Sequence, residues 1–290
     1  MPKPEAKSMM RTILVPLGPG LAGDPALDAA LVLAKRMNSH IRAMFVRPDP
    51  RAAILYMPLA GARITWAAIE QQGREAAEAA KECFDAWRSQ HEIPDVPRDD
   101  RLDSCFASWA ERADEIDKVV TKFGRVSDLI VMSRFKPGDV VAERCFDAAA
   151  FGTGRPTLLV PREPAPDMLE HVMIAWNGSL EASHAVFGSM QLLRAAARVS
   201  IFSVPEAACD EADGAELAEA LSWYGIPTHL AGRSVVRCST GAALLAVARM
   251  SEVSLVVMGA YTHSRLRQSF LGGTTREVLA EATIPILMTH

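Results

Sequence analysis

The residues best suited to chemistry follow an apolar run near the end of the chain. Gly259 ends this run, and the polar loop after it carries four aromatic or basic side chains: Tyr261, His263, Arg265 and Arg267. Gly272-Gly273-Thr274-Thr275 then opens a helix that we expect to reach about Ala282. Glycines admit a phosphate close to the backbone, and free N–H groups at a helix start attract anions. Threonine hydroxyls add donors and the basic side chains add positive charge. The segment predicts phosphate binding; the alternative is a capped helix start with His263 and Arg265 on the surface.

A second candidate lies earlier, where Asn177-Gly178-Ser179 follows the apolar run Val172–Trp176. The Asn177 amide can both donate and accept hydrogen bonds, as a purine or ribose edge requires. The alternative is a plain helix N-terminus, with Ser179 as its cap and Glu181 in the first turn.

Both candidates belong to a pattern that occurs twice along the chain. Short apolar runs recur in the same order in the two halves, and they pair as follows: Ile13–Leu17 with Val172–Trp176, Ile41–Val46 with Val199–Val204, Asp128–Ser133 with Ser254–Gly259, and Pro156–Val160 with Pro285–Thr289. Continuous apolar runs of this length are typical of buried parallel strands. Ala-rich helical segments lie between them, at Pro25–Met37 and Leu180–Ala196 for example. We therefore expect an α/β fold: two tandem open, parallel, five-stranded sheets flanked by helices.

The repeat sets the expected domain boundaries. The first domain should cover residues 1–165, with an insertion at about 47–95 that includes a helix from about Ile64 to Gln90. The second domain should cover residues 166–290, after a charged, Pro-containing linker at Arg162–Glu170. In such sheets ligands bind beyond the carboxyl ends of the strands, where both candidate segments fall.

Composition excludes several other classes of protein. The 290 residues carry a net charge of −4, which argues against a nucleic-acid-binding protein. No apolar run is long enough to span a membrane, and the polar residues 1–11 do not resemble a secretory signal. Five cysteines without a C-x-x-C pair predict reduced thiols rather than a disulfide or zinc framework, as in a cytoplasmic protein.

Taken together, these residues resemble the universal stress proteins of the UspA type. ATP-binding members of that family carry G-2x-G-9x-G-[ST] after the fourth strand. Gly259, Thr262 and Gly272 keep this spacing, although Thr262 replaces the second glycine and Gly273 replaces the hydroxyl residue. The family's first-strand Asp falls on Asn177. The resemblance covers nearly the whole chain and implies a Rossmann-like, adenine-nucleotide alpha-hydrolase-like fold.

The resemblance also implies a ligand and the residues that hold it. The ligand is ATP or another adenine nucleotide, with Mg²⁺ as its usual companion, and the expected function is regulation in a stress response. The base would lie near Ala175, Val204 and Met258, with Asn177 beside it. The phosphates would lie on Gly259, Thr262, Gly272, Gly273 and Thr274, to which the loop chemistry adds His263, Arg265 and Thr275. No catalytic residue and no resident metal site is expected.

The first copy departs from this pattern. Gly18 stands at the first-strand Asp position, and no comparable glycine spacing follows Ser133. Phe151–Arg155 contains glycines, but we expect it to end a helix. The first copy is therefore expected to be structural, or adapted to another ligand.

Three alternatives remain at this point: a nucleotide-independent interaction protein, a small-ligand-binding protein of the same fold, and a weak ATPase. The S-G-G-x-D-S and P-loop motifs are absent. Gly18, Gly20 and Gly23 match dinucleotide spacing, but Asp24 follows where a phosphate would lie. The strands Pro156–Val160 and Pro285–Thr289 are expected to pair within one chain as a pseudo-dimer, and a homodimer is a further option. Neither nucleic acid nor membrane is expected as a partner.

Overall fold

The computed structural model describes residues 10–18, 24–47, 49, 66–95, 105–136, 138–162, 167–203, 214–233, 239–260 and 273–290. Five of the predicted site residues, Val204, Thr262, His263, Arg265 and Gly272, lie outside these ranges. The chain forms two compact units, Met1–Arg155 and Pro156–His290. No helix in the described ranges is long and apolar enough to cross a membrane.

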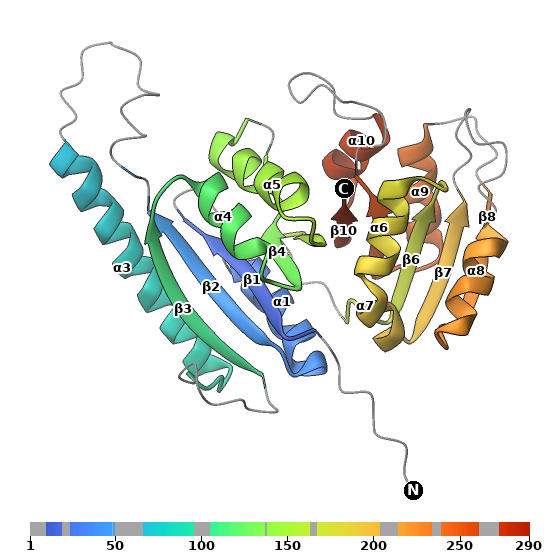
Figure 1. The fold of residues 1–290 in the computed structure, drawn as a ribbon, viewed down its shortest axis with the longest axis horizontal. Coiled ribbons are helices and arrows are strands. Elements are labelled where there is room, and N and C mark those ends of the chain that lie inside the picture. The colour runs from blue at the N-terminus through green and yellow to red at the C-terminus, as the bar shows by residue number, and fades with distance from the viewer. Residues whose placement is uncertain are drawn as a thin grey trace, which may run out of the picture. The chain divides into compact units, whose positions relative to one another are not determined.

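The first unit is an open parallel sheet in the order β3-β2-β1-β4 (Figure 1). Its elements in chain order are β1 (Thr12–Leu17), α1 (Asp24–Met37), β2 (His40–Arg47), α3 (Trp66–Gln90), β3 (Phe106–Ala113), α4 (Ile116–Gly124), β4 (Leu129–Ser133) and α5 (Val140–Gly152). Helices α4 and α5 cover one face, and α1 and α3 cover the other. Ile13, Leu14 and Val15 are fully buried, as expected for a central strand covered on both faces.

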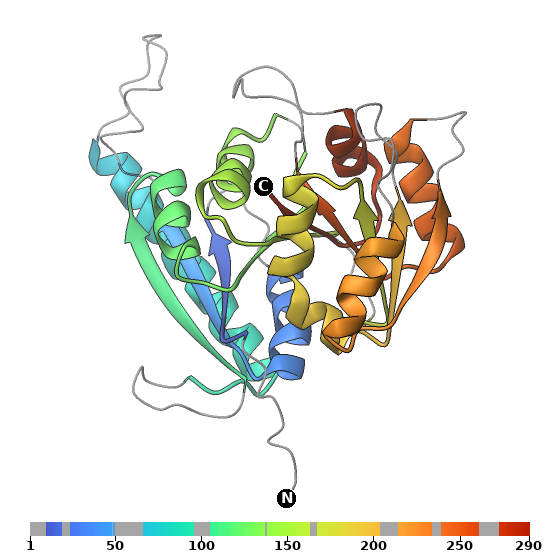
Figure 2. The same ribbon diagram turned by 45° about the vertical axis from the view of Figure 1, so that its right-hand side comes forward.

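The second unit has the sheet order β5-β10-β9-β6-β7-β8, and all its strands are parallel except β5. Its elements are β5 (Thr157–Val160), β6 (His171–Trp176), α6 (Leu180–Gly188), α7 (Met190–Ala195), β7 (Arg198–Ser203), α8 (Gly214–Trp223), β8 (Thr228–Arg233), α9 (Thr240–Met250), β9 (Leu255–Gly259), α10 (Gly273–Glu281) and β10 (Ile286–Thr289). Helices α6, α7 and α8 lie on one face, with α9 and α10 on the other (Figures 1 and 2).

Strand β5 ends the first repeat in sequence, yet its contacts place it in the second unit. It runs antiparallel to β10, with Leu158 opposite Leu287, so the expected pairing of these two strands is present. The units therefore divide before β5, whereas the sequence placed the domain boundary in the linker after it.

One predicted helix is in fact two. The segment Leu180–Ala196 is interrupted at Ser189, which is buried and separates α6 from α7. The Ser189 hydroxyl donates to the carbonyl oxygens of Ala185 (2.7 Å) and Val186 (3.1 Å). A serine that bonds back to the preceding turn favours a bend or an end there, which apolar periodicity does not reveal.

Candidate functional site

The candidate site lies at the carboxyl edge of the second sheet, between β6 and β9. Strands β7 and β8 lie on one side of β6 in the sheet, whereas β9 and β10 lie on its other side. This change of direction marks the crevice where open α/β sheets bind ligands. Ala175 and Met258 are register partners across the two strands, and Gly259 follows Met258 directly. The structure thus brings together three residues that the sequence placed on one site.

Gly259 is also required by packing. A Cβ at this position would lie 2.6 Å from the backbone nitrogen of Ala182 and 2.8 Å from the carbonyl carbon of Glu181. Contacts this short with backbone atoms do not occur in folded proteins, so only glycine fits without moving helix α6. The absent side chain lets the first turn of α6 lie directly against the end of β9, which makes that turn part of the same edge.

The turn between β6 and α6 is shaped by Asn177, Gly178 and Ser179. Gly178 adopts a left-handed conformation with φ of 73°. The Asn177 amide oxygen accepts a hydrogen bond from the Ser179 N–H (3.2 Å), and the Ser179 hydroxyl accepts one from the Ala182 N–H (3.1 Å). Ser179 is therefore the helix cap that the plainer interpretation predicted, and the amide oxygen of Asn177 helps to fix the turn.

Helix α10 begins with the three described residues of the predicted phosphate loop. Gly273 is exposed, and a Cβ built on it meets no atom of the described residues within 4 Å, so those residues do not require glycine there. Thr274 is half-buried and Thr275 is buried, so Thr275 faces the protein interior. The first turn contains no acidic residue. Among the described residues, this helix start therefore combines backbone donors with open space and a first turn that has no acidic side chain.

A carboxylate of helix α10 is hydrogen-bonded to the start of helix α9. Glu277 accepts a hydrogen bond from the hydroxyl of Ser239, which is also the N-cap of α9. Gly241 makes room for this side chain, because a Cβ there would lie 2.5 Å from a Glu277 carboxylate oxygen. The contact fixes α10 relative to the sheet, and with it the position of Gly273 and Thr274.

Three residues that the sequence argument missed lie near the same edge. Trp176, half-buried, ends β6 opposite Ser203. Thr289 is the register partner of Gly259, and its buried hydroxyl has no hydrogen-bond partner among the residues that the structure describes. His290 places its Nδ1 3.0 Å from the carbonyl oxygen of Ala260. The last residues of β6 and β10 could have been found by inspecting every strand end, including strands without a glycine-rich loop.

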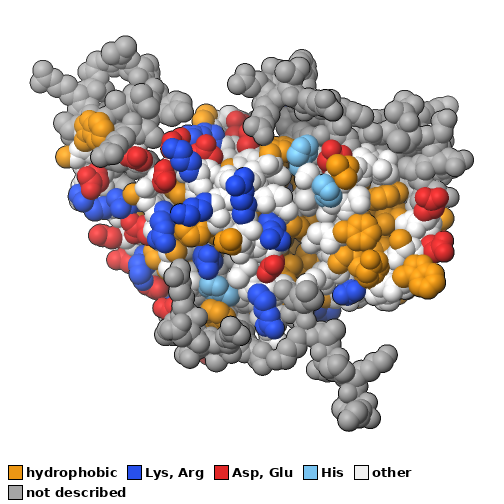
Figure 3. Space-filling model, in the orientation of Figure 1, with side chains coloured by type: hydrophobic (Ala, Val, Ile, Leu, Met, Phe, Trp, Pro, Cys, Tyr) orange, Lys and Arg blue, Asp and Glu red, His pale blue; other side chains and the backbone are white. Residues whose placement is uncertain are grey.

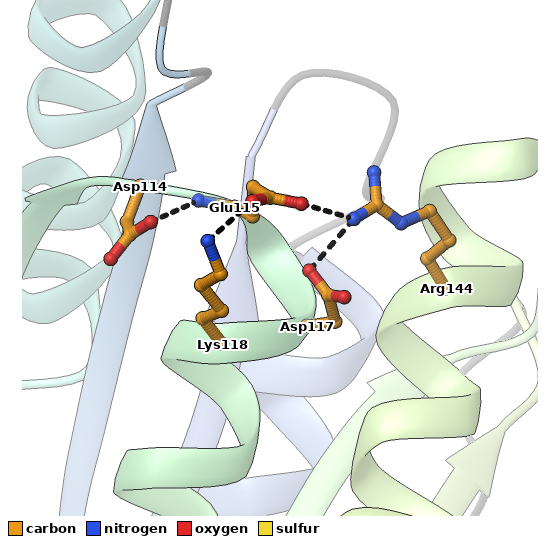
Figure 4. A network of polar contacts seen from close by, with 5 residues as sticks. All are labelled: Asp114, Glu115, Asp117, Lys118 and Arg144. Atoms are coloured by element: carbon orange, nitrogen blue, oxygen red, sulfur yellow. Dashed lines mark hydrogen bonds and ion pairs between the residues drawn. The ribbon is translucent and has the colours of Figure 1, made fainter. Parts of the chain in front are cut away.

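The corresponding edge of the first unit is occupied by an ion-pair network (Figure 4). Arg144 on α5 donates to Glu115 (3.0 Å) and to Asp117 (2.8 Å) at the start of α4. Lys118 pairs with Glu115 as well, and the Asp114 carboxylate accepts the Glu115 N–H (2.8 Å). Hydrogen bonds from Lys118 and then Arg144 hold the pKa of Glu115 below its usual range. Both cations of the network already have carboxylate partners.

Helix α5, which corresponds to α10 in the repeat, also has its N-terminus closed by carboxylates. Asp139 accepts from the Ala142 N–H (3.1 Å), and Glu143 accepts from the Gly138 N–H (2.7 Å). The glycines near its far end do not form a phosphate loop: α5 ends at Gly152, and Gly154 is left-handed with φ of 66°. This is the helix end that the sequence predicted for Phe151–Arg155.

Neither unit shows a metal centre in its described residues, where no group of three or more His, Cys, Asp or Glu side chains could hold an ion. The three described cysteines are free thiols, and they range from exposed (Cys83) through half-buried (Cys105) to buried (Cys145). Burial raises the pKa of the Cys145 thiol, which makes it a poor nucleophile.

Comparison with known proteins connects the second unit to one family. Residues 168–290, which include every strand of the candidate edge, match the universal stress protein family. No protein among the curated sequences compared matches the chain.

Two solved structures share the fold over nearly the whole chain. A universal stress protein from Archaeoglobus fulgidus DSM 4304 is similar with a TM-score of 0.69 and 16% identity, over 97% of this chain and 98% of that one. A protein assigned to the same class from Pseudomonas aeruginosa UCBPP-PA14 has a TM-score of 0.56 and 15% identity, over 98% and 95%. At these identities the likeness concerns the fold alone.

Proposed function

We propose that this chain, whose residues 168–290 match the universal stress protein family, binds ATP or another adenine nucleotide in its second unit and serves as a regulatory protein of a stress response. The observation that carries the proposal is the start of α10. It lies in the connection that leaves the carboxyl end of β9, its first turn is free of acidic side chains, and no described residue fills the space beside Gly273.

The residues at this edge are of the types that bind nucleotide phosphates. Gly259, Gly273 and Thr274 would hold the phosphates together with Thr262 and Gly272, using backbone N–H groups and one hydroxyl. The buried hydroxyl of Thr289, which is in register with Gly259 and bonded to no described residue, is a further polar group at this edge. A magnesium ion would accompany the phosphates and offset their charge.

The base and ribose would lie on the other side of the crevice. Ala175 is half-buried and Met258 is buried at the adjoining strand ends, and these two residues would form the apolar wall that the sequence predicts together with Val204. Asn177 can reach a purine or ribose edge through its amide. Micromolar affinity requires about 8 kcal/mol, which a few backbone donors and one apolar slot can supply.

Equilibrium binding of ATP with Mg²⁺ to the full chain tests the proposal. We expect a dissociation constant in the micromolar range, about 8 kcal/mol of binding free energy. Gly272→Val should abolish this binding while the circular dichroism spectrum stays native, because the added side chain fills the phosphate path. A wild-type chain that binds no ATP even at millimolar concentration would sink the proposal and favour a nucleotide-independent interaction protein.

A further inference from the structure

Four exposed cations of the first unit gather around the end of helix α4. They come from three separate segments of the chain, and they are Arg112 on β3, Lys122 in the last turn of α4, Arg125 directly after that helix and Arg155 after α5. Figure 3 shows Lys and Arg side chains concentrated over α4, to the left of the centre of the view. We call these four residues the basic patch.

Contacts in the structure join the members of the basic patch to one another. The guanidinium of Arg112 and the ammonium of Lys122 lie 5.4 Å and 5.8 Å from the centroid of the same Phe123 ring. Lys122 and Arg125 line one open depression of the surface. The Arg155 guanidinium donates a hydrogen bond to the main-chain oxygen of Arg125 (3.2 Å). The patch is therefore continuous from β3 to the turn after α5.

The positive charge of the basic patch is not neutralised by neighbouring carboxylates. None of its four cations forms an ion pair with a residue that the structure describes. Asp117 also lines the depression, but its carboxylate already accepts from Arg144 (2.8 Å). The three arginines donate to main-chain oxygens, as Arg125 does to Gly152 (2.9 Å). These bonds orient the guanidinium groups and leave further N–H donors on each of them.

The helix macrodipole does not account for the whole patch. Cations near the last turn of a helix are stabilised by its partial negative charge, which explains Lys122 and Arg125. Arg112 belongs to a strand and Arg155 to the turn after another helix, so no local rule places them there. Like charges that share one surface repel each other, and a bound anion would offset this repulsion.

We propose that the basic patch binds an acidic segment of another protein that also carries apolar side chains. Carboxylates match the planar guanidinium of arginine with two hydrogen bonds, and they pair with lysine as well. Val126, which is 66% exposed, lines the same depression as Lys122 and Arg125. The surface thus offers an apolar contact beside its cations, and a segment in which Glu and Leu side chains are mixed would use both.

A nucleic acid fits this surface less well than an acidic peptide. The Phe123 ring is half-buried and already lies against Arg112 and Lys122, so it is a poor platform on which to stack a base. The net charge of −4 on the whole chain opposes a long polyanion. A short segment can remain close to the patch, since the Debye length is about 10 Å at 0.1 M salt.

Fluorescence anisotropy of a labelled peptide with the full chain tests the proposal, and the probe is a peptide of repeated Glu-Leu-Glu-Glu units. We expect a dissociation constant below about 100 µM at low salt, and weaker binding as salt screens the charges. Lys122→Gln, which removes no hydrogen bond of the described residues, should weaken binding about threefold, as for one exposed charge pair. The double variant Lys122→Gln, Arg125→Gln should weaken it on the order of tenfold.

The matched control is the double variant Arg74→Gln, Lys81→Gln. It removes the same charge from two exposed cations of α3, which covers the other face of the first sheet, and should bind the peptide as the wild type does. Equal losses in the two double variants would mean that only net charge matters and would overturn the proposal. A wild-type chain that does not bind the peptide at about 1 mM would overturn it as well.

Three other probes test the chemistry of the partner. A Gln-Leu-Gln-Gln peptide should not bind, and a Glu-Ser-Glu-Glu peptide should bind more weakly than the leucine peptide. Equal binding of the serine and leucine peptides would contradict the apolar contact at Val126. A single-stranded RNA that binds more tightly than the leucine peptide, and loses affinity in Lys122→Gln, Arg125→Gln, would overturn the proposal in favour of a nucleic acid. ATP binding should be unchanged in that variant, which keeps this test separate from that of the nucleotide site.

Discussion

The starts of α5 and α10 occupy corresponding places in the two units, yet they offer opposite environments to an anion. At α5, the carboxylates of Asp139 and Glu143 accept hydrogen bonds from backbone N–H groups at the start of the helix. At α10, the first turn has no acidic residue, and residues 260–276 contain neither Asp nor Glu. The same fold thus presents one helix start that supplies its own negative charge and one that does not.

The strand ends differ in the same way. Gly259 at the end of β9 allows α6 to approach, whereas Ser133 at the end of β4 carries a buried side chain. Arg144 in the first unit is already bonded to two carboxylates. The comparison teaches that the two units keep the same sheet while they differ in a few local charges and in one close backbone approach, the features on which the proposed nucleotide site depends.

The largest expected effect comes from a side chain at Gly259. Gly259→Ala should destabilise the second unit by about 3 kcal/mol, because the new Cβ overlaps backbone atoms of α6. Hydrogen exchange of β6 and β9 peptides measures the loss within that unit. The matched change Gly273→Ala, at a position where no described residue lies within 4 Å of the new Cβ, should leave stability unchanged or raise it by about 0.5 kcal/mol. Equal effects at the two glycines would show that Gly259 is not fixed by packing.

A carboxylate at the start of α10 should make the second unit resemble the first. Gly273→Asp should weaken ATP binding at least tenfold, or about 1.4 kcal/mol, through repulsion of the phosphates at a site that neighbouring atoms leave open. Gly273→Asn has nearly the same size without the charge and should retain most of the affinity. Titration calorimetry on both variants separates the effect of charge on ATP affinity from the effect of side-chain size. Equal losses of affinity in the two variants would argue against a phosphate at this helix start.

The buried strands, and the difference between the loops that follow β4 and β9, were predictable from the sequence because local patterns of residues indicate them. The continuous apolar runs that became β1, β6 and β9 predicted buried parallel strands, and the loop after Gly259 had no counterpart after Ser133. Strands β3 and β8 were not located, because they lie at sheet edges and expose much of their surface. Edge strands need no continuous apolar run, so sequence periodicity carries little information about them.

The finer features of the site depend on contacts between distant segments. Nothing local to Gly259 indicates that Ala182 lies against it, and nothing local to Gly241 indicates Glu277. The closure of α5 by Asp139 and Glu143 was readable in principle, since an acidic residue before a helix and another in its first turn form a known capping pattern.

Acid should affect the first unit more than the second. In each unit, a histidine at the start of a strand is hydrogen-bonded to a serine hydroxyl: His40 to Ser108 (2.6 Å) and His171 to Ser200 (2.7 Å). Burial, aided by Arg42, lowers the pKa of His40 to about 4 from 6.5, and burial also lowers the pKa of His171. The unfolded chain therefore binds more protons than the folded one between pH 6.5 and 4, so stability falls as the pH falls through this window.

The variant His40→Gln should flatten that decline in the first unit, as measured by denaturant unfolding at pH 7, 6, 5 and ~4.5. His184→Gln is the control for the substitution itself, because His184 is exposed on α6 in the second unit. If His40→Gln retains the wild-type slope, His40 does not carry the acid sensitivity of this unit.

The smallest expected effect tests whether the carboxylates of the first unit serve stability alone. Asp139→Ala removes the hydrogen bond to the Ala142 N–H and should cost about 1 kcal/mol of unfolding free energy in the first unit, as loss of a helix cap does. Asp139→Asn keeps an acceptor oxygen without the charge and should recover most of this loss. Neither variant should create a second ATP site, because Glu143 still accepts the Gly138 N–H and Arg144 stays bonded to Glu115 and Asp117. A second equivalent of bound ATP in either variant would mean that the Asp139 carboxylate alone prevents nucleotide binding in the first unit. That unit would then retain the ability to hold a nucleotide.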